Sequence, residues 1–351
     1  MFTFANVNNA FTDMVRAFLP NNHNSPLRDL IVTRPSRNGL VYQVTIPVTV
    51  AYKNPCQRVL FNQARDANPF FHLYEAMWML AGRSDVKPLS YYTGQIMQFS
   101  DDGKYLNGAY GFRWRQASVP WGRVGRMDQL GVLIEHLKAR PDSRRAVLSM
   151  WNVVDDLSKI DSSRDVCCNL CVMFMINNNR LDMTVANRSN DMILGMFGAN
   201  LVHFSFLQEY MASSIGVPVG IYYQFSNNLH VYEANYHPDV WLSDKTPSSY
   251  DGANNFVPLF IQSTDRSTFD LECVDFTTRH SADSMAGWYR TPFLRDVAQP
   301  MCIAFHFYKR KDFASALSVA STVQASDWRQ AAVQWITKRK NRAAMGGVAN
   351  D

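Results

Sequence analysis

The feature that most constrains the fold is the apolar run "VCCNLCVMFMI" at residues 166–176, which precedes the turn signal "NNNR" and a second apolar run. Two apolar runs joined by such a turn are typical of a β-hairpin. The first run is too apolar to be exposed on either face, so it predicts a strand in a covered sheet. This predicted strand carries three cysteines, Cys167, Cys168 and Cys171.

Segments with helical and strand periodicity surround this hairpin. Helices are predicted for "NPFFHLYEAMWMLAG", which carries the single carboxylate Glu75, for "MDQLGVLIEHLKAR", and for "GANLVHFSFLQEYMASSIG", which ends at Gly216. Strands are predicted within residues 30–52 and 218–232. Because strands and helices mix without a regular βαβ alternation, the predicted fold class is α+β.

The chain shows no repeat, low-complexity tract or flexible linker that would divide it. Its 351 residues, 47% of them hydrophobic, are enough for one large core. We expect a single domain, with a catalytic core at residues 1–245 and a mostly helical C-terminal extension at residues 246–351. In the last predicted helix, "SDWRQAAVQWITKRKNR", Ser326 is expected to be the N-cap.

Charge and cysteine content limit the classes of partner and compartment. A formal net charge of +5 does not require a polyanionic partner, although a small phosphorylated ligand fits. The N-terminus is too polar for a signal peptide, and no window of eighteen residues is wholly apolar. Six scattered cysteines without a leader favour free thiols in the cytoplasm.

The three cysteines of the hairpin have several possible roles. A structural zinc site needs further soft ligands, and His203 and His230 lie in apolar contexts without a partner motif. A redox motif would open a helix, whereas this C-x-x-C lies in a predicted strand. Buried packing is the ordinary role of a cysteine in an apolar strand, and we assign it to Cys167 and Cys171.

Cys168 differs because positive charge is predicted nearby. Arg188, which is followed by Ser189, lies across the hairpin and can lower the pKa of a nucleophilic thiol. The adjacent pair Arg144 and Arg145 leads into the same predicted sheet. Guanidinium groups match phosphate oxygens in bidentate geometry, so these arginines favour a phosphate site beside the thiol.

These residues resemble the thymidylate synthase family, in a consistent order over residues 28–235. The matching segments are "TRPSRNGL", "HLYEAMWMLAG", "LNGAYGFRWR", "PDSRRAVLSMWN", "CNLCVMF", "NRSNDMILG", "GANLVHFSFLQEYMA" and "NNLHVY". The resemblance implies a sandwich in which a large mixed sheet of each subunit packs against its partner's in a homodimer. It also implies a one-carbon transfer that uses 5,10-methylenetetrahydrofolate as co-substrate and no metal.

The resemblance implies roles for individual residues. Cys168 matches the nucleophile that adds to C6 of a pyrimidine, and Glu75 and Tyr110 match the groups that organise water and proton transfer. Asp191 matches a folate-binding aspartate. The residues that match phosphate ligands are Arg34, Arg188, Ser189 and, donated by the partner subunit, Arg144 and Arg145. The residues that match base and sugar ligands are Asn200, His230 and Tyr232, where Asn200 requires one residue inserted in "MFGAN".

Departures from the family pattern favour one branch. Synthases usually have His where this chain has Asn169, and a tryptophan that packs on the folate falls on Ile96. Synthases also end in an apolar tail that excludes water before hydride transfer, whereas this chain ends in "KRKNRAAMGGVAND". These departures favour a hydroxymethylase, in which water adds to the intermediate.

The sequence leaves more than one substrate and more than one activity open. The amide of Asn200 can present a donor and an acceptor, which favours dUMP and its product 5-hydroxymethyl-dUMP. A dCMP or CMP hydroxymethylase, a thymidylate synthase that makes dTMP, and a non-catalytic nucleotide- or RNA-binding homologue are the alternatives. No membrane is expected as a partner, and no nucleic acid is required.

Overall fold

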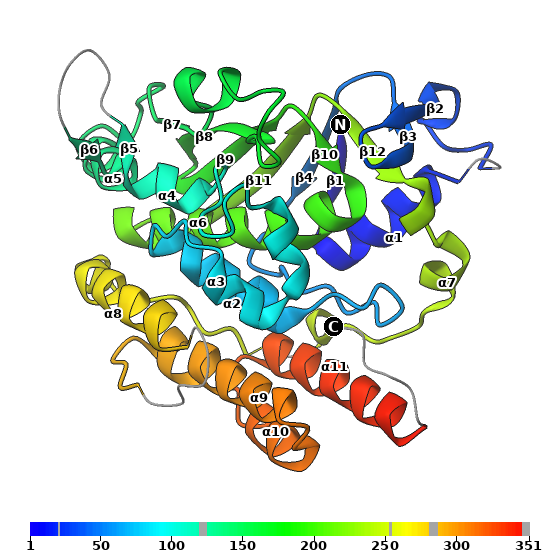
Figure 1. Ribbon diagram of the computed structural model, residues 1–351. Coiled ribbons are helices and arrows are strands. Elements are labelled where there is room, and N and C mark those ends of the chain that lie inside the picture. Colours follow the sequence, from blue (N-terminus) through cyan, green and yellow to red (C-terminus); the bar gives the residue numbers. More distant parts are fainter. Residues whose placement is uncertain (20–21, 119–124, 253–254, 281–286, 346–351) are drawn as a thin grey trace.

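The computed structural model describes residues 1–19, 22–118, 125–252, 255–280 and 287–345. The chain is arranged in layers (Figure 1). A mixed sheet lies on one side, helices α2, α3 and α6 run beneath it, and helices α8 to α11 form the outermost layer. This arrangement confirms the predicted α+β class.

The main sheet has six strands in the order β1-β4-β11-β9-β8-β7. Its strands are β1 (Phe2–Phe4), β4 (Val48–Tyr52), β11 (Val219–Ser226), β9 (Arg180–Asn187), β8 (Asn169–Asn177) and β7 (Val147–Ser149). The pairs β1/β4 and β9/β11 are parallel, and the other neighbours are antiparallel. The predicted hairpin is confirmed as the antiparallel pair β8/β9.

A second sheet has four strands in the order β10-β12-β3-β2. They are β10 (Asn190–Asp191), β12 (Leu229–Tyr232), β3 (Gly39–Val44) and β2 (Ile31–Ser36), and a small ribbon joins β5 (Ala117–Ser118) to β6 (Arg126–Met127). Two successive predicted strands, β11 and β12, therefore belong to different sheets. β10 follows β9 directly in the sequence, so it lies beside the end of the hairpin and joins the hairpin to the second sheet through β12.

Eleven α-helices lie within the described residues. They are α1 (Val7–Ala17), α2 (Pro69–Leu80), α3 (Lys87–Tyr92), α4 (Tyr110–Arg115), α5 (Gln129–Ala139), α6 (Asn200–Ile215), α7 (Pro238–Ser243), α8 (Arg266–Arg279), α9 (Gln299–Lys309), α10 (Phe313–Ala320) and α11 (Ser326–Ala344). Helix α6 is buried on nearly all sides, packs against α2, β9 and β11, and ends at Gly216 with φ of 92°, as predicted.

One face of the main sheet is open in the single chain. Along β8, Val172 and Phe174 point into the core, whereas Met173 and Met175 are 41% and 49% exposed. On the neighbouring strand, Val147 is 48% exposed. The chain by itself therefore leaves these side chains exposed, and the prediction that both faces of this strand are covered stays a prediction.

The C-terminal helix α11 packs its tryptophans inward, but its start differs from the prediction. Ala325 is the N-cap, and Ser326 is the first helical residue, whose hydroxyl accepts a hydrogen bond from the backbone N–H of Asn255. The hydroxyl has a tertiary partner, so the prediction of Ser326 as N-cap was wrong. Residues 346–351, which are the last six residues of the tail "KRKNRAAMGGVAND", lie outside the described residues.

The basic residues near the end of α11 face the body of the protein. Lys338 and Arg339 form ion pairs with Asp66 at 3.3 and 3.0 Å, and the guanidinium of Arg339 stacks on Trp335 at 3.3 Å.

Among the helices of the described ranges, none combines the length and apolar character that a bilayer crossing requires.

Candidate active site

The predicted nucleophile, Cys168, lies one residue before β8, where the chain leaves a loop and enters the main sheet. Its backbone N–H donates a hydrogen bond to the hydroxyl of Tyr110 at 3.3 Å, and its carbonyl accepts one from the backbone N–H of Arg188 at 2.9 Å. The structure thus brings Cys168, Tyr110 and Arg188 together, although they are far apart in the sequence.

Two effects act on the thiol of Cys168 in opposite directions. Burial raises its pKa, and the charges of Arg188 and Arg37 lower it, while Asp165 adds to the increase. Burial is the largest effect, so the pKa of Cys168 stays above its usual value. The predicted direction of the Arg188 effect is confirmed, but this effect does not outweigh burial.

The side chain of Arg188 is held in a fixed orientation. Its Nε donates to the carbonyl oxygen of Cys167 at 2.8 Å, and its Nη2 donates to that of Val166 at 2.9 Å. These two bonds leave the Nη1 group for an anionic ligand. The geometry is suited to a phosphate oxygen close to the cysteine, as expected for a preorganised guanidinium.

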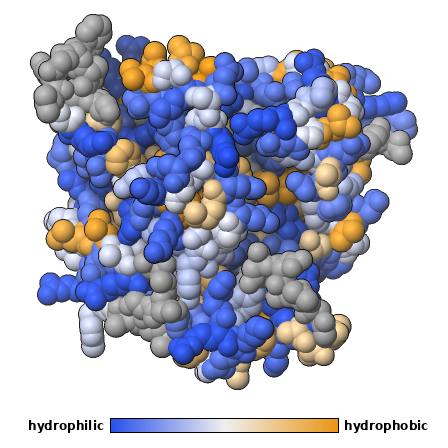
Figure 2. All heavy atoms as spheres, in the orientation of Figure 1, coloured by the Kyte–Doolittle hydropathy of each residue, from blue (hydrophilic) through white to orange (hydrophobic). Residues whose placement is uncertain are grey.

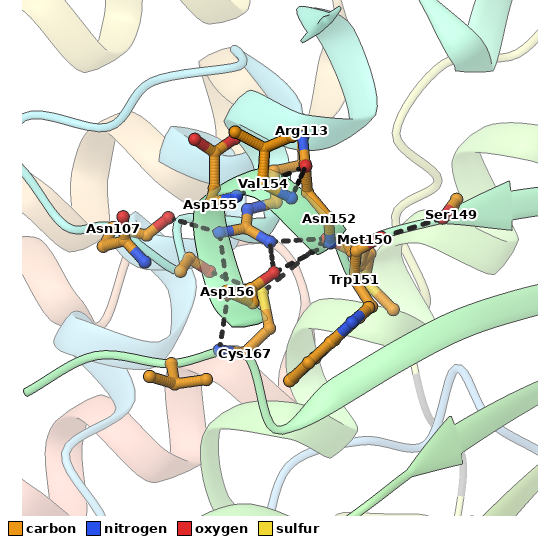
Figure 3. Close-up of polar contacts among 12 residues, drawn as sticks. Asn107, Arg113, Ser149, Met150, Trp151, Asn152, Val154, Asp155, Asp156 and Cys167 are labelled. Carbon is orange, nitrogen blue, oxygen red and sulfur yellow. Dashed lines mark hydrogen bonds and ion pairs between the residues drawn. The ribbon is translucent and has the colours of Figure 1, made fainter. Parts of the chain in front are cut away.

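A buried ion pair supports the loop before the nucleophile (Figure 3). Arg113 of α4 binds both carboxylate oxygens of Asp156, and it also donates to the carbonyl oxygens of Met150 and Asn107 at 2.6 and 2.7 Å. The backbone N–H of Cys167 donates to Asp156 Oδ1 at 3.3 Å. The pair therefore fixes the backbone immediately before Cys168.

The positions of Cys167 and Cys171 are typical of structural cysteines. Cys167 is fully buried, and burial raises the pKa of its thiol well above the usual value. Cys171 lies in β8 and is partly buried. All six cysteines have free thiols, and among the described residues no three His, Cys, Asp or Glu side chains are grouped to hold a metal ion.

Asn200 begins helix α6 directly after a π-helical segment, Met192–Ala199. A π-type turn accommodates one extra residue, and this is where the sequence comparison required an insertion. Asn200 Nδ2 donates to Asn190 Oδ1 at 3.3 Å, and Asn190 Nδ2 donates to Ser226 Oγ at 3.0 Å. A Cβ atom at Gly195 would lie 2.6 Å from Asn190 Oδ1, so a glycine is needed for this contact.

The second sheet places Asp191 beside His230. These two residues are register partners in the parallel pair β10/β12, and the His230 ring packs edge-on against Tyr232. Burial raises the pKa of Asp191 and lowers that of His230. Asp191 Oδ1 accepts hydrogen bonds from the backbone N–H groups of Ile193 and Leu194, both at 2.7 Å, which leaves the other carboxylate oxygen for a ligand.

Glu75 lies on α2 and is 6% exposed. Its Oε2 lies 2.8 Å from Nε2 of His203, a residue of α6 for which the sequence indicated no functional partner. His72, one turn before Glu75 on α2, is a second imidazole near this carboxylate. The spacing of His72 and Glu75 was visible in "HLYEAM", but nothing in the sequence linked His203 to them.

The remaining predicted phosphate ligands are farther from this group. Arg34 lies on the exposed strand β2, and Arg144 and Arg145 are exposed in the loop before β7. No hydrogen bond or ion pair joins any of them to Cys168 or Arg188 within the described part of the chain. Ser189 follows Arg188 and is partly buried. The predicted roles of these residues stay predictions.

Comparisons with known proteins agree with this geometry. The family model "Thymidylate synthase" matches residues 63–279. A deoxyuridylate hydroxymethyltransferase of Pseudomonas phage M6 is 43% identical over 339 residues, which cover 91% of this chain and 93% of that protein.

Two further relatives match shorter regions. A deoxyuridylate hydroxymethyltransferase of Bacillus phage SP01 is 44% identical over 193 residues, which cover 54% of this chain and 50% of that protein. A thymidylate synthase of Corynebacterium aurimucosum is 33% identical over 166 residues, which cover 46% of this chain and 59% of the synthase. The chain therefore belongs to the thymidylate synthase family, as a one-carbon transferase of the branch that contains the phage hydroxymethyltransferases.

Proposed function

We propose that this protein transfers a one-carbon unit from 5,10-methylenetetrahydrofolate to C5 of dUMP and that water completes the reaction, giving 5-hydroxymethyl-dUMP. The relative that matches nearly the whole chain is named for deoxyuridylate, and this supports the choice of nucleotide. The arrangement of Cys168, Tyr110 and Arg188 supports covalent chemistry next to a phosphate.

In the structure, the preference for uracil is supported by the hydrogen-bond network of Asn200. Because Asn190 Nδ2 donates to Ser226, Asn190 Oδ1 accepts from Asn200 Nδ2. This orients the Asn200 amide, so that it offers one remaining N–H and its carbonyl oxygen to a base. Uracil presents the complementary pair, the O4 acceptor and the N3–H donor, whereas cytosine presents the reverse pair.

The proposed reaction begins with the thiolate of Cys168. Addition to C6 makes C5 nucleophilic, and C5 then attacks the methylene group that the folate supplies. Water ordered by Glu75 and Tyr110 removes the C5 proton, and tetrahydrofolate leaves as an exocyclic methylene group forms on the pyrimidine. Water adds to this group, and expulsion of the thiolate restores the pyrimidine double bond.

Several residues are proposed to hold the two substrates. Arg188 and Ser189 would bind the phosphate together with Arg34, and His230 and Tyr232 would bind the sugar hydroxyl. The free oxygen of Asp191 suits an N–H donor of the folate ring. Burial of Asp191 and His230 keeps these groups in a desolvated site, where hydrogen bonds to a ligand are stronger.

We propose further that the active form is a homodimer to which each subunit contributes Arg144 and Arg145. The open face of the main sheet, with Val147, Met173 and Met175, supports a partner sheet packed against it. Figure 2 shows hydrophobic side chains gathered at the upper edge of the molecule, above β7 in Figure 1. Exposed Arg144 and Arg145 lie next to this face in the sequence.

The division of the chain at residue 245 also stays a proposal. In this proposal, residues 246–351 form an extension that packs on the catalytic core. The hydroxyl of Tyr74 in α2 donates to the carbonyl oxygen of Thr277 in α8 at 2.6 Å, and Glu209 of α6 accepts from the backbone N–H of Leu259 at 2.9 Å. These buried contacts support a single domain.

Product analysis tests the proposed function directly. Incubation with dUMP and 5,10-methylenetetrahydrofolate is expected to give a nucleotide that gains one hydroxymethyl group, with tetrahydrofolate as the second product. We expect dUMP to be preferred over dCMP by at least about tenfold in kcat/KM, because the wrong base leaves the Asn200 amide mispaired. Mass spectrometry of the nucleotide and absorbance of the folate give both answers. A methylated product with dihydrofolate, or faster conversion of dCMP, would contradict the proposal.

Subunit complementation tests the proposed dimer. Neither the Cys168→Ser variant nor the Arg144→Ala/Arg145→Ala double variant should be active alone. Mixing the two after partial unfolding and refolding should restore about one quarter of the wild-type activity, because half of the dimers then have one complete site. Refolding each variant alone is the control. Failure of the mixture to exceed both controls would mean that the arginines act within their own subunit or not at all.

A further inference from the structure

Glu75 and His203 form a buried contact within the candidate active site. Glu75 Oε2 and His203 Nε2 are 2.8 Å apart, and their side chains are 7% and 2% exposed. They come from α2 and α6, two helices that pack against each other between the main sheet and the C-terminal layer (Figure 1). An acid and an imidazole in such a position are a candidate for proton chemistry.

This contact lacks the geometry of a hydrogen bond. The two atoms lie at hydrogen-bonding distance but are not aligned as donor and acceptor, and Glu75 Oε2 and both ring nitrogens of His203 are buried without a hydrogen-bond partner among the described residues. A buried polar group without a partner destabilises the folded state. In ligand-free enzymes, catalytic hydrogen bonds are often misaligned and become aligned when substrate binds.

His203 is directed toward the nucleotide side of α6. It follows Asn200 by three residues, so both side chains lie on one face of the helix. Phe204, the next residue, packs against the ring of Tyr110 at 6.1 Å, and the Tyr110 hydroxyl accepts from the backbone of Cys168. These contacts connect the acid–imidazole pair with both the base-recognition residue and the nucleophile.

The other nearby imidazole does not carry a positive charge. Burial lowers the pKa of His72 to about 3, and the charges of Arg65 and His203 contribute to this decrease. His72 is therefore neutral at physiological pH. His203 is the imidazole in direct contact with Glu75.

We propose that His203 is a positioning residue for Glu75, in the step in which water adds to the exocyclic methylene group. The inference rests on the proposed function. When the nucleotide binds, Nε2–H of His203 donates to Oε2 and fixes the carboxylate, whose other oxygen faces the attacking water.

The step is balanced without an oxidant or a reductant. The water oxygen forms a bond to the methylene carbon, and one proton of the water passes to Glu75. The electron pair of the exocyclic double bond moves to C5 and then forms the C5–C6 double bond, which expels the thiolate of Cys168. Glu75 later loses its proton to solvent.

Two amide variants test this role. In His203→Gln the side-chain amide nitrogen takes the place of Nε2, whereas in His203→Asn it takes the place of Nδ1. We expect His203→Gln to keep kcat within about threefold of the wild type and His203→Asn to lose at least about tenfold in kcat, with KM for dUMP nearly unchanged in both. Thermal unfolding of the two variants should be similar, because each buries one amide.

A second measurement, the release of tritium from the substrate, shows whether His203 acts in the addition of water. With C5-tritiated dUMP, tritium is released before water adds, so the ratio of tritium released to product formed should rise in His203→Asn. Equal losses of kcat in the two variants, full activity in His203→Asn, an unchanged ratio, or loss of folding in both would overturn the proposal. Absence of the hydroxymethyl product in the wild type would contradict the proposed function instead, and the two failures are thus distinguishable.

Discussion

Replacement of Cys168 by serine is expected to abolish turnover, with a loss of at least about a thousandfold in kcat. A hydroxyl group is a much weaker nucleophile than a thiolate, and the proposed reaction cannot begin without addition to C6. The variant should still bind dUMP, because the arginines that would hold the phosphate are intact. Turnover is measured by product formation, and binding of dUMP by calorimetry.

The two neighbouring thiols provide matched controls. Cys167→Ser and Cys171→Ser should keep kcat within about tenfold of the wild type, since neither thiol is placed to reach the base. A dUMP analogue with fluorine at C5 should trap a covalent adduct with Cys168, because fluorine cannot leave as a proton does. An adduct found by peptide mass mapping on Cys167 or Cys171 would show that another thiol is the nucleophile.

Replacement of Arg113 by methionine is expected to lower the free energy of unfolding by about 3–5 kcal/mol. Asp156 is fully buried, and without Arg113 its carboxylate has no compensating charge. Burial by itself raises the pKa of Asp156, but the bonds from Arg113 and from backbone N–H groups hold it below its usual value. The contribution of this carboxylate to stability is therefore fully present above the pKa of an unfolded aspartate and is lost as the pH falls through the lower pKa of the folded protein.

Urea unfolding at neutral pH and at one protein concentration measures this effect. The exposed pair Arg279–Asp275 is the control, with 51% and 42% side-chain exposure. Asp275→Asn should change the free energy of unfolding by less than about 1 kcal/mol. Removing both partners, as Arg113→Met with Asp156→Leu, should be less harmful than Arg113→Met alone. Similar effects of Arg113→Met and Asp275→Asn would show that the buried pair does not stabilise the fold.

Local patterns in the sequence were sufficient for several features of the fold. The turn at "NNNR" predicted the hairpin β8/β9, and Gly216 predicted the end of α6, because turn geometry and left-handed caps depend on residues adjacent in the chain. The start of α11 was misplaced, since the partner of Ser326 is Asn255, far away in the sequence. Periodicity does not report such contacts.

The sequence likewise indicated some residues of the candidate site, whereas other contacts in the site were seen only in the structure. Motifs close together in the sequence identified Cys168 and Arg188, and resemblance to a known family added Asp191 and supplied the expected roles. The contact of His203 with Glu75 and the network from Asn200 to Ser226 were not predicted. Each joins residues from separate elements, and a single sequence does not show which elements pack together.

The sequence by itself determined the family, the predicted nucleophile and the charged groups around it, because these depend on residue types in a fixed order. Only the tertiary structure decided how the thiol, the amide of Asn200 and the carboxylate of Glu75 are oriented. Burial raises the pKa of Cys168 despite the nearby arginines, and Asn190 selects one orientation of the Asn200 amide. Both effects arise because solvent exclusion and hydrogen-bond direction are properties of packed side chains.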